Sequence, residues 1–225
     1  MDFEIIKPAD IEKRSFAIIT EELGDRVFPE EIGLVVKRVI HTSADVDYAD
    51  NLVFSGGAVP RALEAIRNGA HIVTDTNMVK AGINKKTLAK FGGEVHCFVA
   101  DADVAEEAKQ RGVTRSTVSM ERAAKLDVPV IFAIGNAPTA LIELDRLMRE
   151  QDLKPELIIG VPVGFVNVVE SKELILQSQA PHIVARGRKG GSNVAAAIVN
   201  AMWAPFRMAS SARGTAPSEN TRLSA

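Results

Sequence analysis

The chain has 225 residues, 46% of them hydrophobic, and its 27 Lys and Arg against 29 Asp and Glu give a formal net charge of −2. This near balance argues against a nucleic-acid-binding protein, which needs a cationic surface to meet the phosphate backbone. The hydrophobic content argues against disorder over most of the chain, and the length allows one large domain or two small ones.

Targeting signals are absent from the sequence. Cys97 is the single cysteine, so no disulfide can form within the chain. The start of the chain has neither the basic nor the apolar region of a secretory signal. No apolar run reaches the roughly 18 residues that a membrane span needs. We therefore expect a soluble cytoplasmic protein with neither membrane nor nucleic acid as a partner.

Two helices, predicted over residues 8–23 and 29–40, precede a regular alternation of short apolar runs and amphipathic runs. The apolar runs are rich in Val and Ile and predict strands over residues 52–55, 71–75, 95–100, 129–135, 157–162 and 182–185. The amphipathic runs predict helices over residues 58–68, 103–110, 120–126, 139–151, 171–177 and 194–207.

Most of these strands show no alternation of polar and apolar residues, which is typical of parallel strands buried on both faces. Their alternation with helices predicts the α/β class, with a doubly wound, mainly parallel sheet, helices on both faces and extra N-terminal helices. We expect residues 1–208 to form one such domain. Residues 209–225 hold one Leu and no periodicity, so we expect a disordered C-terminal tail.

In a doubly wound sheet the ligand crevice lies beyond the carboxyl ends of the strands. Residues 186–193 follow the last predicted strand and hold three cations, three glycines and the pair Ser192-Asn193. This loop is either a carboxylate or phosphate site or an exposed basic turn with a helix cap, and its place at a strand end favours the anion site. The glycine-rich motifs of nucleotide-binding loops are missing, which argues against a dinucleotide ligand.

A second candidate is the segment over residues 39–45, where His41, two hydroxyl residues and Asp45 close an apolar helix. Imidazole is the side chain best suited to proton transfer near neutral pH. Taken alone, the segment favours a simpler interpretation, in which His41 complements the helix dipole and Thr42 and Ser43 form a turn.

The remaining titratable candidates favour structural roles. His71, His96 and His182 lie at or within predicted strands, and no two His or Cys residues have metal-ligand spacing. Cys97 lies in an apolar strand and is expected to be a buried, inert thiol. Arg115 opens a helix, where it either binds an anion or is solvated.

Seven motifs occur in one order along the chain, and together they resemble the precorrin-8X methylmutase family over residues 1–205. They are Arg14-Ser15, Val39-Ile40-His41-Thr42-Ser43-Ala44-Asp45, Thr74-Asp75-Thr76-Asn77-Met78-Val79, Thr114-Arg115-Ser116, residues 133–141, residues 160–167 and Gly187-Arg188-Lys189-Gly190-Gly191-Ser192.

The resemblance implies a flavodoxin-like α/β domain, usually a homodimer. It implies an isomerase that moves a methyl group from carbon 11 to carbon 12 of a tetrapyrrole, giving hydrogenobyrinic acid, or cobyrinic acid when cobalt is already inserted. The family's catalytic histidine corresponds to His41, with the implied role of donating a proton to the macrocycle. No resident cofactor or metal is implied, and cobalt enters only as part of the substrate.

A flat apolar ring with carboxylate arms needs an apolar slot and several separated cations or hydrogen-bond donors. The alternative function is a non-catalytic tetrapyrrole carrier that uses the same crevice, and a flavin- or nucleotide-binding domain is the weaker third possibility. The expected substrate-binding residues are Arg14, Ser15, Thr42, Ser43, Thr76, Asn77, Met78, Arg115, Ser116, Asn136, Thr139, Gly164, Phe165, Arg186, Arg188, Lys189, Gly190, Gly191 and Ser192.

Overall fold

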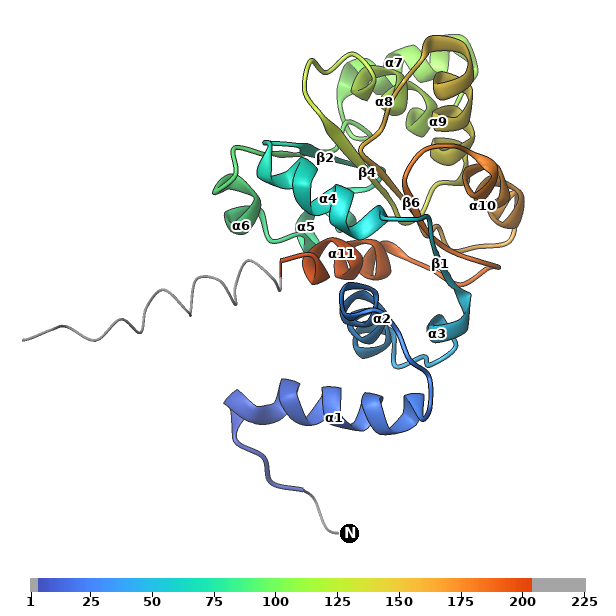
Figure 1. Cartoon of the computed structure of the whole chain (residues 1–225). Coiled ribbons are helices and arrows are strands. Elements are labelled where there is room, and N and C mark those ends of the chain that lie inside the picture. Colours follow the sequence, from blue (N-terminus) through green and yellow to red (C-terminus); the bar gives the residue numbers. More distant parts are fainter. Residues whose placement is uncertain (1–3, 204–225) are drawn as a thin grey trace, which may run out of the picture.

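The computed structural model describes residues 4–203, and its first elements are the two predicted N-terminal helices (Figure 1). A 3-10 turn, η1 (Pro8–Asp10), leads into α1 (Ile11–Leu23), and α2 (Glu30–Ser43) packs along it. The second helix runs three residues past its predicted end at residue 40. Ser43 is accommodated because its hydroxyl donates to the carbonyl of Val39 at 2.8 Å, and the helix ends where Ala44 becomes left-handed.

All six predicted strands are present in one sheet. They are β1 (Leu52–Phe54), β2 (His71–Thr74), β3 (Val95–His96), β4 (Val130–Ile134), β5 (Leu157–Gly160) and β6 (His182–Ala185). The third is much shorter than the predicted 95–100. It is an edge strand, and the apolar residue Phe98 beyond it packs against the cluster of Val104, Ala108 and Val118 instead of a neighbouring strand.

The strand order is β1-β6-β5-β4-β2-β3, with β1 antiparallel to β6 and all other pairs parallel. Numbered among themselves, the five parallel strands have the order 2-1-3-4-5, which is that of flavodoxin-like folds. The predicted fold class is therefore confirmed. The order reverses between β2 and β4, so their carboxyl ends mark the topological switch point at which such sheets bind ligands.

Eight helices follow the short α3 (Tyr48–Asn51) within the described residues. They are α4 (Ala58–Arg67), α5 (Asn77–Gly82), α6 (Lys85–Ala89), α7 (Ala102–Arg111), α8 (Arg115–Ala123), α9 (Pro138–Gln151), α10 (Val168–Gln177) and α11 (Ser192–Ala201).

Two parts of the helix prediction were wrong. The helix predicted from residue 120 begins at Arg115, because the Thr114 hydroxyl accepts the N–H of Thr117 and caps it. The short α5 and α6 were not predicted as helices, although Thr76 and Asn84 cap them in the same way. Residues 204–207 of the last predicted helix, the domain end at residue 208 and the tail over 209–225 lie outside the described residues.

Each face of the sheet has its own hydrophobic core. In β4, Ile131 and Ala133 pack with α2, α4 and α11, whereas Phe132 and Ile134 pack with α8, α9 and α10 on the other face. Because both faces are covered, apolar residues occupy successive positions of the central strands, which accounts for their lack of alternation. Within residues 4–203, no helix combines the length and the apolar character needed to cross a membrane.

Candidate functional site

The loops after β2 and β4 are joined at the switch point by Asp75. This side chain is 1% exposed, and its carboxylate accepts the N–H groups of Gly135 at 3.0 Å, Asn136 at 2.7 Å and Ala137 at 2.6 Å. Burial raises the pKa of the Asp75 carboxyl above its ordinary value, against the opposing effect of these three donors. Asp75 therefore fixes the backbone from which Asn136 projects.

The start of α11 closes against both of these loops. The hydroxyls of Thr76 and Ser192 lie 3.0 Å apart and share a hydrogen bond. A Cβ added to Gly135 would lie 2.8 Å from the Cα of Ser192, so the loop after β4 touches α11 through backbone alone. Three predicted site residues, Thr76, Asn136 and Ser192, thus gather at the switch point.

Three of the predicted glycines permit the loops after β5 and β6 to pack side by side. A Cβ on Gly190 would lie 2.1 Å from the carbonyl oxygen of Val161, and Gly191, with φ +139°, donates its N–H to that same oxygen at 2.9 Å. Gly164, with φ +145°, donates to the carbonyl of Arg188 at 3.2 Å. Backbone conformation and close approach account for these glycines without a ligand.

Large apolar side chains are exposed along the same edge. Phe165 is 79% exposed and Met78 is 72% exposed, and Val163 and Val166 are exposed beside Phe165. The guanidinium of Arg188 lies over the Phe165 ring, 5.4 Å from its centroid. An apolar face bordered by a cation suits a ligand that is both flat and anionic.

The basic loop between β6 and α11 is held by contacts from α10. Lys172 of α10 is fully buried, and its ammonium donates to the carbonyls of Gly187 at 2.7 Å and Lys189 at 2.8 Å. Burial lowers the pKa of Lys172 to about 8. Arg186 lies 3.9 Å from Glu173 and is otherwise open to solvent.

His41 is exposed in the last turn of α2, where its ring stacks on Phe16 of α1 with 5.4 Å between centroids. Thr42 is exposed beside it, and the Ser43 hydroxyl bonds to the helix backbone. The turn that follows is linked to the crevice, because the ammonium of Lys189 lies 2.7 Å from carboxylate oxygens of both Asp45 and Asp47.

The remaining predicted residues lie at the edges of this arrangement. The hydroxyl of Thr114 donates to that of Thr139 at 3.0 Å, which places the start of α8, with exposed Arg115 and buried Ser116, beside the start of α9. Arg14 and Ser15 lie on α1. Their hydrogen bonds go to Glu4 and to the carbonyl of Ile11 rather than to the loops at the strand ends.

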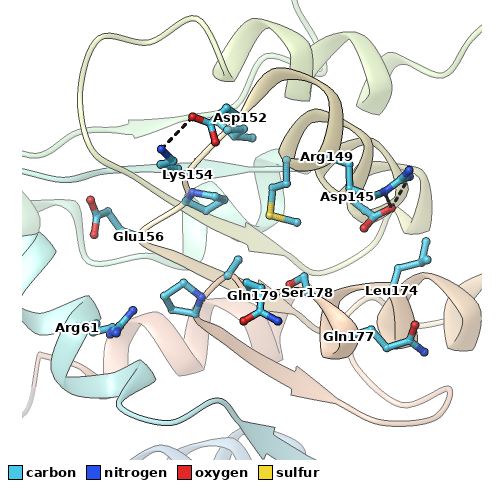
Figure 2. Close-up of a pocket in the computed structure, with 15 residues that line it drawn as sticks. Arg61, Asp145, Arg149, Asp152, Lys154, Glu156, Leu174, Gln177, Ser178 and Gln179 are labelled. Carbon is cyan, nitrogen blue, oxygen red and sulfur yellow. Dashed lines mark hydrogen bonds and ion pairs between the residues drawn. The ribbon is translucent and has the colours of Figure 1, made fainter.

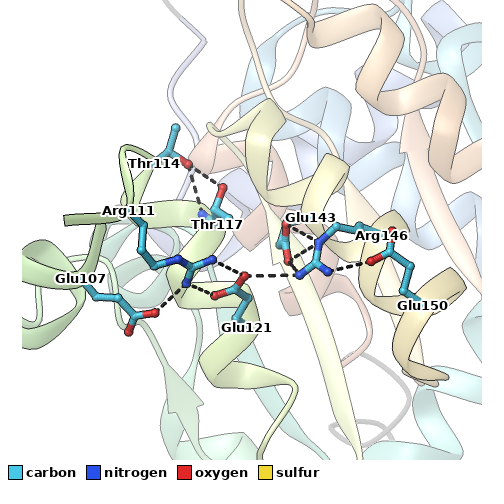
Figure 3. Close-up of polar contacts among 8 residues, drawn as sticks. All are labelled: Glu107, Arg111, Thr114, Thr117, Glu121, Glu143, Arg146 and Glu150. Carbon is cyan, nitrogen blue, oxygen red and sulfur yellow. Dashed lines mark hydrogen bonds and ion pairs between the residues drawn. The ribbon is translucent and has the colours of Figure 1, made fainter. Parts of the chain in front are cut away.

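A chain of ion pairs fixes α8 against its neighbours (Figure 3). The Glu121 carboxylate of α8 pairs with Arg111 of α7 at 2.8 Å and with Arg146 of α9 at 3.3 Å, and Arg146 also pairs with Glu143 and Glu150. Arg111 lowers the pKa of Glu121, which therefore stays ionised. The position of Arg115 at the N-terminus of α8 is thereby set by contacts on the outer side of the helix.

A cavity of about 790 Å³ opens at the amino ends of the strands, opposite the carboxyl ends (Figure 2). It lies between α9, α10 and the segments that lead into β5 and β6, and its lining includes Asp145, Arg149 and Leu174. None of the predicted site residues lines it. The carboxyl edge is the stronger candidate, because parallel sheets bind ligands there.

Sequence reasoning missed two buried ions that hold the candidate site together, Asp75 and Lys172. The sequence contained a signal for Asp75, because this residue ends a predicted strand at the switch point. Lys172 had one as well, because it occupies the same helical stripe as Val168 and Ile175, which are apolar and buried. Among residues 4–203, no three His, Cys, Asp or Glu side chains are arranged to hold a metal ion.

Fold and candidate site define a doubly wound α/β protein that carries exposed apolar side chains and cations in the loops after the carboxyl ends of its parallel strands. The family model for precorrin-8X methylmutase matches residues 10–204. A cobalt-precorrin-8 methylmutase of Priestia megaterium is 47% identical over 197 residues, covering 88% of each chain. One from Salmonella typhimurium is 44% identical, covering 91% of this chain and 99% of its own.

The fold agrees with this match. The crystal structure of a precorrin-8X methylmutase from Thermus thermophilus superposes with a TM-score of 0.79 at 37% identity, covering 90% of this chain and 98% of that one. The chain belongs to the precorrin-8X methylmutase family. It is an isomerase of cobalamin biosynthesis, which performs an intramolecular methyl transfer.

Proposed function

We propose that the chain moves a methyl group from carbon 11 to carbon 12 of precorrin-8X or cobalt-precorrin-8, forming hydrogenobyrinic or cobyrinic acid. The observation that carries this proposal is the placement of Arg188 over exposed Phe165, in the loops after the carboxyl ends of β6 and β5, in a chain from this family. A corrinoid macrocycle presents a flat apolar ring and several carboxylates, and both features find partners in those loops.

In this proposal the ring lies against Met78 and Phe165, and its carboxylates meet Arg186, Arg188 and Arg115. All five side chains are exposed and follow strand ends or begin helices. The hydroxyls and amides of Thr76, Asn77, Asn136, Thr139 and Ser192 supply neutral hydrogen bonds. A cation and a hydroxyl from different loops can meet the same carboxylate arm, which orients the ring as well as binding it.

His41 is the proposed general acid. It donates a proton to the macrocycle, the methyl group moves with its bonding electrons from carbon 11 to carbon 12, and the proton then returns to the imidazole. Support comes from its exposure at the end of α2 and from its stacking on Phe16, which holds the ring in one orientation. General acid catalysis of this kind contributes about 10²- to 10⁴-fold in rate.

The test incubates the enzyme with metal-free and cobalt-containing precorrin-8 in parallel. Turnover is seen as a visible spectrum that changes with time while the mass of the pigment stays constant. His41→Ala should bind hydrogenobyrinic acid as the wild type does and turn over about 10²- to 10⁴-fold more slowly. A spectral change that is immediate and then constant would identify a carrier, and normal turnover by His41→Ala would remove the general-acid role.

The proposal includes no resident cofactor, and cobalt, where it occurs, is part of the substrate. It also includes a homodimer and a cytoplasmic location. The dimer is supported by apolar side chains exposed on and beside α1, which stands at the edge of the molecule against α2 (Figure 1). Ile5 is 97% exposed, Val27 is 91% exposed and Ile11 is 52% exposed. Large apolar side chains exposed along one element are typical of association surfaces.

A further inference from the structure

Lys189 has more negative charge beside it than a cation that binds a substrate carboxylate should have. Its ammonium is 2.7 Å from the carboxylate of Asp45 and 2.7 Å from that of Asp47. Two anions on one cation leave a local charge of −1. A carboxylate arm approaching Lys189 would therefore meet a net negative group and would have to displace a partner.

The Asp45 carboxylate is held in place on both of its oxygens. One accepts the N–H of Asp47 at 3.1 Å within the turn after α2, and the other faces Lys189. Lys189 holds the pKa of Asp45 below its ordinary value, so the pair remains ionised at neutral pH. Asp45 lies four residues after His41, and Ala44, left-handed at φ 53°, is the hinge between helix and turn.

The other end of the contact is equally fixed. The carbonyl of Lys189 itself accepts a hydrogen bond from buried Lys172, and the next residue, Gly190, packs without space for a Cβ against Val161. The Lys189 side chain thus extends from a rigid backbone to the turn that follows the catalytic helix, across 142 residues of sequence.

We propose that Lys189 is a positioning residue, which ties the loop between β6 and α11 to the turn after His41, and not a cation that binds a substrate carboxylate. The effect on rate rests on the proposed function, since it acts through His41. Partly exposed ion pairs add little to global stability. Misplacing a catalytic group by about 1 Å can cost about 100-fold in rate. Loss of this tie should therefore reduce kcat far more than it reduces stability.

The experiment compares Lys189→Met, the double variant Asp45→Asn/Asp47→Ala, and the triple variant. Asn at position 45 can still accept the N–H of residue 47, so the turn is kept while the ion pair is lost. Lys154→Met is the matched control, because Lys154 is an exposed lysine paired with an aspartate, Asp152, at the amino ends of the strands.

The first two variants should each lower kcat by about 10- to 100-fold. Their Kd for hydrogenobyrinic acid, measured by visible absorbance, should stay within about twofold of the wild type, and Tm should change by less than about 4 °C. The triple variant should be no slower than Lys189→Met, because all three changes remove one contact. Lys154→Met should match the wild type in every measurement.

A substrate-binding Lys189 gives the opposite pattern. Lys189→Met would then weaken product binding by about tenfold or more, whereas removing its aspartate partners would leave binding unchanged or tighten it. That result, or kcat losses that add in the triple variant, would overturn the proposal.

A readout independent of turnover separates this inference from the proposed function. The ¹H–¹³C NMR signal of the His41 ring, assigned through His41→Ala, should shift in the same way in Lys189→Met and in Asp45→Asn/Asp47→Ala. It should not move in Lys154→Met. If the wild type shows no turnover while these shifts appear, the proposed function is wrong, but the positioning of His41 by the contact of Lys189 with the two aspartates is supported. If the His41 signal is unchanged in both variants, the tie is wrong whatever the turnover.

Discussion

At the scale of single residues, buried ions decide how the site is held. Asp75 is an acidic and Lys172 a basic side chain, both buried, and each is hydrogen-bonded to backbone rather than paired with a side chain of opposite charge. Asp75 takes N–H groups from one loop, and Lys172 gives hydrogen bonds to carbonyls of another. Backbone dipoles offset part of the cost of burying such charges. The same contacts fix the two loops that carry Asn136 and Arg188.

The lowered pKa of Lys172 predicts a pH-dependent stability. The folded protein releases this proton near pH 8 and the unfolded chain near 10.5, so between these values the unfolded state binds more protons. The free energy of unfolding contributed by Lys172 therefore rises as pH increases through this range, by up to about 3 kcal/mol.

Urea unfolding of the wild type and Lys172→Met at pH 7 and pH 9.5 checks this linkage. The other lysines and the single tyrosine, Tyr48, titrate alike in both proteins, so the difference between the two proteins reports on Lys172. We expect the wild type to gain stability relative to the variant at the higher pH. An equal difference at both pH values would show that Lys172 titrates as it does in the unfolded chain.

At the scale of elements, the site is built by loops that approach one another through glycine. The loops after β4 and β6 each contribute one glycine at which a Cβ would meet backbone, namely Gly135 and Gly190, and the loop after β5 contributes Gly164, which has a positive φ. In Gly135 and Gly190 the clash would be with main-chain atoms, which cannot rotate away. The loops at the carboxyl ends of the strands are therefore positioned by direct backbone contacts, without intervening side chains.

Gly190→Ala should therefore disturb the crevice. The new Cβ would lie 2.1 Å from the carbonyl of Val161, so the loop must move. Overpacking of this kind costs about 1–3 kcal/mol, and the displaced Arg188 should weaken binding of hydrogenobyrinic acid. Gly56→Ala is the control, because nothing lies within 4 Å of its added Cβ. Urea unfolding and product titration that find the two variants alike would contradict the close-approach argument.

At the scale of the whole molecule, the N-terminal helix is the least enclosed element. α1 packs against α2, and Ile11 and Ile18, seven residues apart, lie on the same helical face, with 52% and 38% of their area exposed. This helix also carries Phe16, on which His41 stacks. A partner covering α1 would therefore stabilise the element that contacts His41, the proposed general acid.

The proposed homodimer is tested by light scattering after size exclusion. The wild type should have twice the mass of the chain, and Ile11→Asp/Ile18→Asp should have the mass of one chain, because charges at a buried interface are costly. Ile142→Asp is the control, since Ile142 is as exposed as Ile18 but lies on α9. A wild type with the mass of one chain would contradict the dimer, and dissociation of the control alone would place the interface elsewhere.

Much of the fold was predictable because the spacing of apolar residues along the chain indicates which faces of an element are buried. The strands are largely apolar without alternation, which indicates that both faces are covered, and their alternation with helices leaves few topologies. The strand β3 was predicted too long, and the helices α5 and α6 were not predicted, for local reasons. An edge strand and a single capped turn depend on one or two contacts, and such contacts leave little trace in composition.

The sequence by itself determined the α/β class, the strands, the loops that carry the site and, through seven ordered motifs, the family. It did so because hydrophobic period and motif order are properties of the chain. Tertiary structure alone decided what each charge does. Lys189 and Arg188 are adjacent and look alike in the sequence, yet one is paired with two aspartates and the other lies over an exposed ring. Of the two partners of Lys189, Asp47 is 142 residues away and Asp45 lies two residues further, so only folding brings them within reach.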